Sequence, residues 1–531
     1  MDSGSVSEHS EKHSPEHAHT AIAKLRDVDV AAALDSDKPL DPEVAARLRK
    51  KIDWHLMPLM CIMYLMAFAD KITLGQSAVL GILPGANLTQ NQFNWLGTVF
   101  YLSYLAFEYP QNLALQTLPV ASTSSSGVSL FYVMQHASLL EGSSLSGSFS
   151  ACAKACQPSE WLTPVGLQSP TGAITPGFMI VTSMFYTRAE QNKRVGYWFL
   201  MNGFAIIFLG FVSFGVLHTK TENFMPWQWL MIITGIITLV TAVLFWFFFP
   251  DSPTTAYFLT PEERAQAVQR IKINQAGVEN KHWKRDQFIE AFTDPKVWVM
   301  ALFAAVGQVN VVNSLTNQRQ LIINQFGFTP IQTTLLGSVD GVVEILTIWL
   351  GVSLVAIPAL GRGYTAVMCF VPALLGSILV STLPSHNRIG LLFSYWIAIF
   401  VFVPFVILLG WMGTITSGHT KKTTVNAIVL CAYAIGNAAG PFMWKKHYQP
   451  RNHVPWAVIS ACIFTCAMLM LLLRFMLASE NKNRDAEKRD DTYDDVYITE
   501  VTTDGKTIEK RVDRAFLDLT DIQNRDFRYV L

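Results

Sequence analysis

An acidic and a basic residue stand side by side within an apolar stretch of the sequence. Asp70 and Lys71 lie near the middle of residues 52–80. A carboxylate in such a place can take up and release a proton, and an ammonium can attract the carboxylate of a bound anion. Neighbouring residues point about 100° apart on a helix, so the two side chains cannot both face lipid comfortably. The alternative is that the pair lies at a helix end that water reaches.

Two more carboxylates occur in an apolar stretch of the second half of the chain. Asp340 and Glu344 are spaced i, i+4 and therefore share one face of a helix. Glu344 lies deep enough in its stretch to be a second proton carrier. The alternative is that both carboxylates belong to a salt-bridge network near the cytosolic side, with Arg362 or Lys421 as the partner.

Amide side chains are the candidate contacts to a substrate. Asn202 lies partway into an uncharged stretch, where it could bond either a substrate or a neighbouring helix. Asn310, Asn313 and Asn317 are spaced i, i+3, i+7 and share one helix face. This row of amides predicts the wall of a polar cavity.

Other polar residues are predicted to be gates or structural anchors. Glu108 either lines the cavity or pairs with a basic residue near the cytosolic face, and the second interpretation is favoured. The run from His419 to Lys422 joins two late apolar stretches, where we expect a gate or a topological anchor. The residues in this class are Glu108, Asp340, His419, Lys421 and Asn437.

Ten stretches of about twenty residues with almost no charge must position these groups. They cover residues 52–68 (running on toward 80), 93–115, 195–217, 227–249, 297–315, 333–357, 364–383, 389–411, 423–444 and 454–473. A helix of this length crosses a hydrocarbon core of about 30 Å, and in lipid only a helix or a closed barrel satisfies its own backbone. The chain is therefore predicted to be an all-α protein that crosses the membrane many times.

Composition excludes several other classes of protein. The 531 residues are 51% hydrophobic and 15% charged, with 40 basic and 40 acidic residues, so we expect no nucleic-acid partner. The seven cysteines lie mostly in apolar segments, which argues against a disulfide framework, and we expect neither a metal nor a cofactor. An enzyme would need a His/Asp or Ser/His constellation near an interface. The intramembrane polar groups are mostly lone amides and carboxylates, so we expect no enzyme.

The distribution of charge divides the chain into five segments. They are a disordered cytosolic tail (1–50), a first transmembrane bundle (51–250), a cytosolic central loop (251–296), a second transmembrane bundle (297–477) and a cytosolic C-terminal tail (478–531). With the N-terminus inside, the basic central loop and Lys421 are cytosolic, whereas Arg319 falls in an outside loop. The sequon at Asn87 would also lie outside, where it could be glycosylated, although a three-residue motif also occurs by chance.

Several motifs resemble the fungal allantoate permease (anion:cation symporter) family of the major facilitator superfamily. They include Asp70-Lys71, Phe107-Glu108-Tyr109-Pro110, Arg188-Ala189-Glu190-Gln191, Leu200-Met201-Asn202-Gly203, Gly418-His419-Thr420-Lys421-Lys422, Gly436-Asn437 and the ending Phe527-Arg528-Tyr529-Val530-Leu531. The resemblance covers residues 50–116 and 173–531. It implies two bundles of six helices around a cytosolic loop.

The resemblance also implies a function. The expected protein is a monomeric secondary active transporter of the plasma membrane that imports a small organic anion with protons. Allantoate, ureidosuccinate, and vitamin-type carboxylates such as nicotinate or pantothenate are the implied substrates. By this analogy Asp70 and Glu344 serve proton coupling, and Lys71 contacts the substrate carboxylate. The alternatives are a non-transporting nutrient sensor and an inactive transporter-like protein on the same fold.

Residues 117–172 depart from the family pattern. The third helix and the first half of the fourth are expected here, but the segment contains thirteen serines. The family's fourth helix also brings an Arg and a Glu before the position of Pro176-Gly177, and neither is in place. We hypothesise a frame-shifted or unspliced translation. Sequencing the transcript between the codons for Phe107 and Met179 tests this, and a transcript that encodes these same residues would rule it out.

Overall fold

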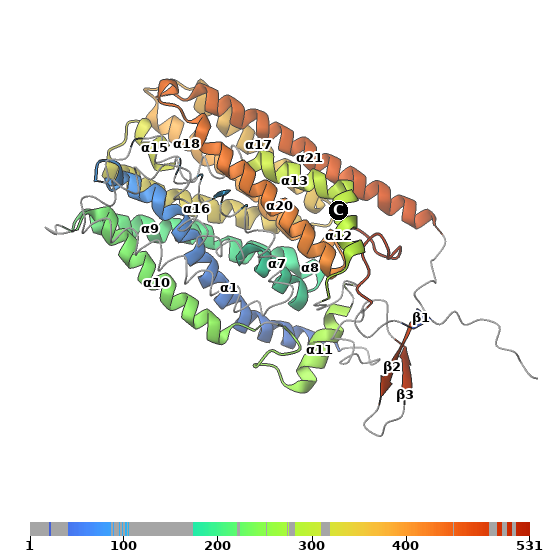
Figure 1. Cartoon of the computed structure of the whole chain (residues 1–531). Coiled ribbons are helices and arrows are strands. Elements are labelled where there is room, and N and C mark those ends of the chain that lie inside the picture. Colours follow the sequence, from blue (N-terminus) through green and yellow to red (C-terminus); the bar gives the residue numbers. More distant parts are fainter. Residues whose placement is uncertain are drawn as a thin grey trace, which may run out of the picture.

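A computed structural model of the chain describes residues 41–85, 174–219, 224–250, 252–272, 282–308, 319–449, 451–487 and 517–531. It also describes single residues at 89, 95, 98, 101, 102, 105 and 274, and the backbone of strands at 21–22, 496–501 and 507–511. Residues 117–172 lie outside this part of the chain. Figure 1 shows long, roughly aligned helices that form one bundle.

The first half of the bundle begins with an unusually long helix. The described helices of this half are α1 (Pro42–Val79), α2 (Ile82–Gly85), α7 (Ile174–Phe185), α8 (Arg188–Phe199), α9 (Met201–Leu217) and α10 (Pro226–Phe248). The start of α1 is fixed by Asp41, whose side chain accepts a hydrogen bond from the Glu43 amide at 3.0 Å, and by Pro42 in the first turn. The helix therefore begins ten residues before the apolar stretch predicted from residue 52.

The connection and the second half follow the same pattern. Two short helices, α11 (Pro261–Lys272) and α12 (Arg285–Thr293), connect the halves. The second half contains α13 (Pro295–Gly307), α15 (Arg319–Gln325), α16 (Pro330–Val355), α17 (Gly361–Thr382), α18 (Arg388–Ala398), η5 (Ile399–Val401), α19 (Phe402–Ile415), α20 (His419–Ala439), η6 (Gly440–Met443), η7 (Lys446–Tyr448) and α21 (His453–Ala486). Outside the bundle, β1 (Ala21–Ile22) pairs in parallel with β2 (Val496–Val501), which pairs antiparallel with β3 (Thr507–Arg511).

Eight of the described helical segments are long and apolar enough to cross a membrane. They differ in how much of their apolar surface other helices cover. In the segment Arg388–Ile415, which contains α18 and α19, 78% of the most apolar window is buried, against 33% in α10. The α18–α19 segment therefore runs through the interior of the bundle, and α10 presents most of its apolar surface outward, as expected of a helix that contacts lipid.

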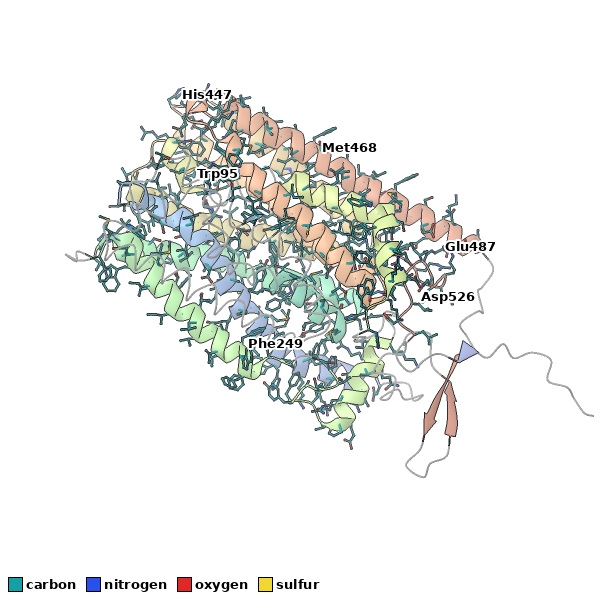
Figure 2. All side chains as sticks on the ribbon, viewed as in Figure 1. Trp95, Phe249, His447, Met468, Glu487 and Asp526 are labelled. Atoms are coloured by element: carbon teal, nitrogen blue, oxygen red, sulfur yellow. The ribbon has the colours of Figure 1, made fainter. Side chains whose placement is uncertain are left out.

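The bundle has two ends that matter for the site. At one end of the bundle lie the start of α1, the helix α12 and residue 531, and we call it the terminal end (Figure 1). We call the opposite end the far end. Figure 2 shows Glu487 and Asp526 at the terminal end and His447 at the far end, with the half-exposed Met468 of α21 between them. Each long helix thus joins the two ends.

The two halves meet most closely where α9 packs against α16. A Cβ atom added to Gly203 would lie 2.5 Å from the Gly341 carbonyl oxygen and 2.6 Å from Ile345 Cγ1. Small residues at such a crossing let two backbones approach within van der Waals contact. This crossing brings Asn202 of the first half next to the polar face of α16.

Gly203→Ala is expected to destabilise the protein by about 1–3 kcal/mol, because the added methyl group must push α9 away from α16. The matched control is Gly215→Ala on the same helix, where an added Cβ meets no heavy atom within 4 Å. The measurement is the midpoint of thermal unfolding of purified protein in detergent, followed by the loss of the monodisperse peak. Equal midpoints for the two variants would show that the crossing tolerates a methyl group.

Candidate functional site

A cavity lies between the two halves. Seven of its thirteen described lining residues are aromatic, and they come from both halves, among them Tyr64 and Phe199 of the first half and Phe405 and Tyr433 of the second. Lys71 is the only charged side chain among these described lining residues. The cavity is therefore a mainly apolar chamber with one cation in its wall.

The ammonium of Lys71 is surrounded by tyrosines and aromatic faces. Its Nζ donates a hydrogen bond to the Tyr433 hydroxyl at 2.7 Å. The same nitrogen lies 5.4 Å from the ring centroids of Tyr101 and Tyr433 and 5.8 Å from that of Phe68. Aromatic faces attract a cation most strongly where water is excluded. The arrangement keeps a positive charge at the cavity surface.

Asp70 points away from the cavity. Its side chain is buried and accepts a hydrogen bond from the Thr238 hydroxyl of α10 at 3.2 Å. The divergence of Asp70 from Lys71 follows from the angle of about 100° between neighbouring residues on a helix. Because α1 continues to Val79 and Asp70 is 5% exposed, the alternative of a water-exposed helix end is wrong.

Asn202 lies between the cavity and a buried carboxylate. It lines the cavity, and its side chain lies close enough to Glu344 of α16 to influence that carboxyl group. Both side chains are buried, at 3% and 2% exposed. Asn202 therefore faces the cavity, and its role as a substrate contact or as a link between helices stays a prediction.

Asp340 belongs to the same buried group as Glu344. It accepts a hydrogen bond from the Trp396 indole at 2.7 Å, and the Arg319 Nε atom lies 3.4 Å from its other oxygen. The proposed network with Arg362 or Lys421 is therefore wrong, because both of those residues lie at the terminal end.

Arg319 was expected in an outside loop, and this prediction is wrong. It begins α15 and is only 4% exposed. A single basic residue in a short polar segment has the hydropathy of a loop, so hydropathy alone could not predict that Arg319 is buried in a helix. The signal that could have found it is the run of amides that ends at Gln318, one residue before it.

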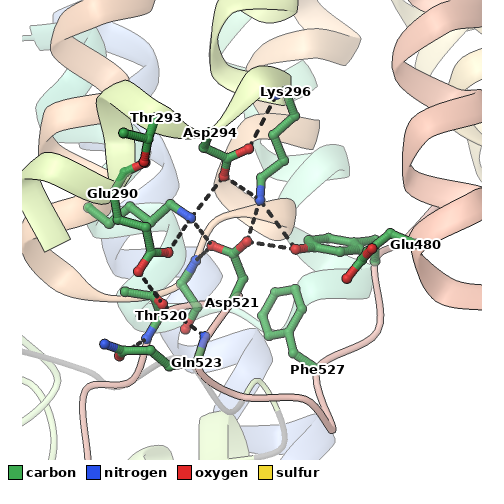
Figure 3. A network of polar contacts seen from close by, with 12 residues as sticks. Glu290, Thr293, Asp294, Lys296, Glu480, Thr520, Asp521, Gln523 and Phe527 are labelled. Carbon is green, nitrogen blue, oxygen red and sulfur yellow. Dashed lines mark hydrogen bonds and ion pairs between the residues drawn. The ribbon is translucent and has the colours of Figure 1, made fainter. Parts of the chain in front are cut away.

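A second group of charged side chains forms ion pairs at the terminal end. The ammonium of Lys421 contacts Glu290 at 2.7 Å, Asp294 at 2.9 Å and Asp521 at 3.0 Å. Lys296 contacts Asp294 at 2.7 Å and also pairs with Asp521 (Figure 3). We call these five residues the terminal cluster. Lys421 was expected to be a gate or an anchor, and its partners could not be identified from the sequence.

The terminal cluster fixes the charge of Asp521. Burial opposes ionisation of this carboxyl, but the ammonium groups of Lys296 and Lys421 outweigh burial and hold its pKa well below the ordinary value of 3.8. The Tyr529 hydroxyl adds a hydrogen bond to Asp521 at 2.7 Å. Asp521 is therefore a carboxylate at neutral pH.

The last fifteen residues pack against the helices of the terminal end. The Trp411 indole donates to the Val530 carbonyl at 2.6 Å, and the Arg362 amide donates to the Leu531 carbonyl at 3.0 Å. The Arg188 guanidinium of α8 lies 3.8 Å from the ring centroid of Phe527. The end of the predicted cytosolic tail is thus a packed element that touches both halves.

The remaining predicted residues divide into two groups. The His419 amide donates to Asp518 at 2.7 Å, and the Asn437 side chain donates to the Tyr433 carbonyl at 2.8 Å and to Gln308 at 3.4 Å. The first contact ties α20 to the C-terminal segment, the second lies within α20, and the third reaches the end of α13. Neither His419 nor Asn437 is among the described lining residues of the cavity. The residues that lie outside the described part of the chain are Asn87, Glu108, Asn310, Asn313 and Asn317.

Comparison with known proteins identifies the family that this architecture belongs to. The model of the Major Facilitator Superfamily matches residues 60–441. The thiamine pathway transporter of Saccharomyces cerevisiae is 29% identical over 94% of this chain and 90% of that protein. The allantoate permease of the same yeast is 29% identical over 92% of this chain and 87% of that protein. An uncharacterised transporter of Schizosaccharomyces pombe is 30% identical over 93% of this chain and 85% of that protein.

Solved structures agree on the fold. The proton:xylose symporter XylE bound to 6-bromo-6-deoxy-D-glucose superposes with a TM-score of 0.61 at 12% identity, over 79% of this chain and 95% of that one. The transporter FucP in the outward conformation gives a TM-score of 0.53 at 14% identity, over 78% of this chain and 98% of that one. At these identities the likeness shows the fold alone. It confirms the prediction of an all-α major facilitator fold.

The predicted class of protein is also confirmed, because the matching family and the named relatives are transporters and not enzymes. The family match spans both halves, the cavity between them and most of the described helices that can cross a membrane. This multi-pass membrane protein therefore belongs to the Major Facilitator Superfamily, and its relatives include the fungal allantoate permease.

Proposed function

We propose that this protein is a secondary active transporter that takes up a small organic anion together with protons. The observation that supports this most is the position of Lys71, an ammonium in the wall of a mainly aromatic cavity between the two halves. In such an environment charge is weakly screened, so the cation favours an anionic ligand strongly. Allantoate, ureidosuccinate, and carboxylate vitamins such as nicotinate or pantothenate are the candidate substrates.

Buried carboxyl groups on two sides of the cavity wall support proton coupling. Glu344 contacts the cavity through Asn202, and Asp70 lies one residue from Lys71 on α1. A carboxyl group in a buried, weakly polar place costs less free energy when it is protonated than when it is charged. Proton binding at these positions would therefore lower the cost of enclosing the two carboxyl groups when the cavity closes during alternating access.

The proposed location is the plasma membrane, with both termini in the cytosol. The terminal end collects basic residues from separate segments, among them Lys284, Lys296 and Lys421. Basic residues accumulate on the cytosolic side of membrane proteins. The same end carries α11 and α12, the connection between the halves (Figure 1).

Transport by purified protein in liposomes tests the proposal. The transcript is sequenced first between the codons for residues 107 and 179, and the verified chain is reconstituted. Each labelled candidate anion is then supplied with an imposed inward proton gradient, and liposomes without protein are the control. Accumulation that collapses on addition of a protonophore supports the proposal. Binding of an anion without any flux would instead identify a sensor on the same fold.

Asp70→Asn is expected to abolish proton-driven accumulation and to spare exchange of labelled for unlabelled substrate. Asparagine cannot carry the proton, whereas exchange needs no net proton movement. Accumulation is measured at a proton gradient of about tenfold, and exchange in the absence of a gradient. Thr238→Ser, which keeps the hydroxyl group that donates to Asp70, is the matched control. Unchanged accumulation in Asp70→Asn would remove this residue from the coupling role.

A further inference from the structure

A transporter that catalyses net uptake must return to its starting state without substrate. This consideration rests on the proposed function, in which Lys71 binds the anion. During the return step the ammonium of Lys71 remains inside a cavity whose lining is mostly aromatic. Withdrawing a charge from water costs on the order of several kcal/mol unless a partner replaces the lost hydration. The return step therefore needs a substitute partner within the protein.

Tyr433 is placed to be that partner. Its hydroxyl oxygen accepts the hydrogen bond from Lys71 at 2.7 Å, and its ring face lies 5.4 Å from the same nitrogen. Hydrogen bonds that involve an ionised group are among the stronger ones in proteins. Tyr101, whose ring centroid lies at the same distance from the Lys71 nitrogen, adds to this environment.

The bond between Lys71 and Tyr433 crosses from one half of the protein to the other. Lys71 belongs to α1 and Tyr433 to α20. The halves also touch toward the far end, where the Trp95 and Phe442 rings lie 5.3 Å apart. Toward the terminal end, the Arg362 side chain donates to the Arg188 carbonyl at 3.2 Å. The bond therefore lies between two sets of contacts that hold the halves together.

Two neighbouring rings hold the phenol of Tyr433 in position. Its ring stacks on Phe405 with centroids 5.5 Å apart and lies edge-on to Tyr101 with centroids 6.3 Å apart. Phe405 in turn contacts Phe199 of the first half, with centroids 6.3 Å apart. A side chain held in this way loses little freedom when it bonds a cation, so the interaction with Lys71 is preorganised.

We propose that Tyr433 substitutes for the substrate carboxylate at Lys71 and so allows the two halves to close and return without substrate. When a substrate carboxylate binds, the Lys71 ammonium donates its hydrogen bond to the carboxylate in place of the Tyr433 hydroxyl. When the carboxylate leaves, the bond to Tyr433 forms again. Tyr433 is then a positioning residue for the return step of transport. The role concerns net uptake alone, because during exchange the carrier always moves with substrate bound.

Tyr433→Phe tests the proposal, because it removes the hydroxyl group and keeps the ring that stacks on Phe405. Net uptake is expected to slow by about tenfold, because that factor corresponds to the free energy that a hydrogen bond to a charged group typically contributes. Exchange of labelled for unlabelled substrate is expected to slow by a clearly smaller factor than net uptake. Both are measured in liposomes with the same amount of inserted protein. Since exchange requires a folded carrier, a misfolded variant cannot give the expected result.

Tyr64→Phe is the matched control. Tyr64 lines the same cavity, but its ring packs edge-on against Trp198, with centroids 4.6 Å apart. This variant should not separate net uptake from exchange. If Tyr433→Phe slows both processes equally, or slows neither, the proposal is overturned. If the wild-type protein exchanges no organic anion at all, the proposed function fails together with this inference, and that outcome is distinct because it appears before any variant is made.

Discussion

Lys421→Met is expected to lower the free energy of unfolding by about 3–5 kcal/mol, because it removes one partner from a buried group of charges. The terminal cluster holds three carboxylates and two ammonium groups, so its formal charge is −1. Loss of Lys421, whose side chain is fully buried, changes this charge to −2 and leaves Lys296 as the only ammonium in the cluster. Repulsion between the carboxylates then adds to the lost attraction.

Comparison with two other variants isolates this effect. Asp521→Asn takes the charge of the cluster from −1 to zero and should therefore cost less than Lys421→Met. Lys482→Met makes the same chemical change at an exposed position on α21 and should leave stability nearly unchanged. The measurement is the thermal unfolding midpoint in detergent at neutral pH. A larger loss in Asp521→Asn than in Lys421→Met would contradict the charge count.

The same cluster makes stability depend on pH in a defined direction. A carboxyl group whose pKa is lower in the folded state contributes stability above its ordinary pKa, and this contribution is lost as the pH falls toward the folded pKa. The pKa of Asp521 lies well below its ordinary 3.8, because the attraction of Lys296 and Lys421 exceeds the opposing effect of burial. The wild-type protein should therefore lose stability below about pH 4 more steeply than Asp521→Asn.

Lys71→Met is expected to lower the apparent affinity for the anion by at least roughly thirtyfold, and therefore to weaken both net uptake and exchange strongly. Truncating one partner of a buried charge pair typically costs about 2–5 kcal/mol. Methionine fills the same space among the aromatic rings but offers the substrate carboxylate no charge. The measurement is the concentration dependence of exchange in liposomes. This result would differ from that expected of Tyr433→Phe, which affects exchange less than net uptake.

A second variant separates charge from shape at this position. Lys71→Arg keeps a positive charge in the cavity wall and is expected to recover part of the affinity, although its planar group cannot occupy the same place. Recovery by arginine together with loss in methionine would assign the effect to charge. If Lys71→Met instead exchanged substrate with wild-type affinity, the anion would have to bind elsewhere.

The sequence predicts the membrane helices well because hydropathy reports a property of each segment alone. It misplaced the start of α1, because the residues from Pro42 to Lys51 are rich in charge and form a helix that extends beyond the apolar stretch. For the same reason α21 continues to Ala486, past the apolar residues that end near 473. Charged helix ends are specified by caps and by packing, which a count of apolar residues does not detect.

The charged groups of the site were predicted only in part. Asp70, Lys71 and Glu344 stood out because each is unusual within its own apolar segment. Lys296 and Asp521 did not, because they come from polar segments 225 residues apart and meet only when the chain folds. Arg319 was missed for a related reason, since its partner Asp340 is on the next helix. Pairing between distant segments is a property of the tertiary structure.

The position of the last residues has a consequence for how this protein is made and handled. Leu531 and Val530 occupy places among the helices, bonded to Arg362 and Trp411. The terminal end thus depends on a carboxylate that lies 225 residues along the chain from Lys296, so a chain truncated before Asp521 leaves Lys296 and Lys421 without that carboxylate. An affinity tag joined directly to Leu531 would place new residues against this packed surface.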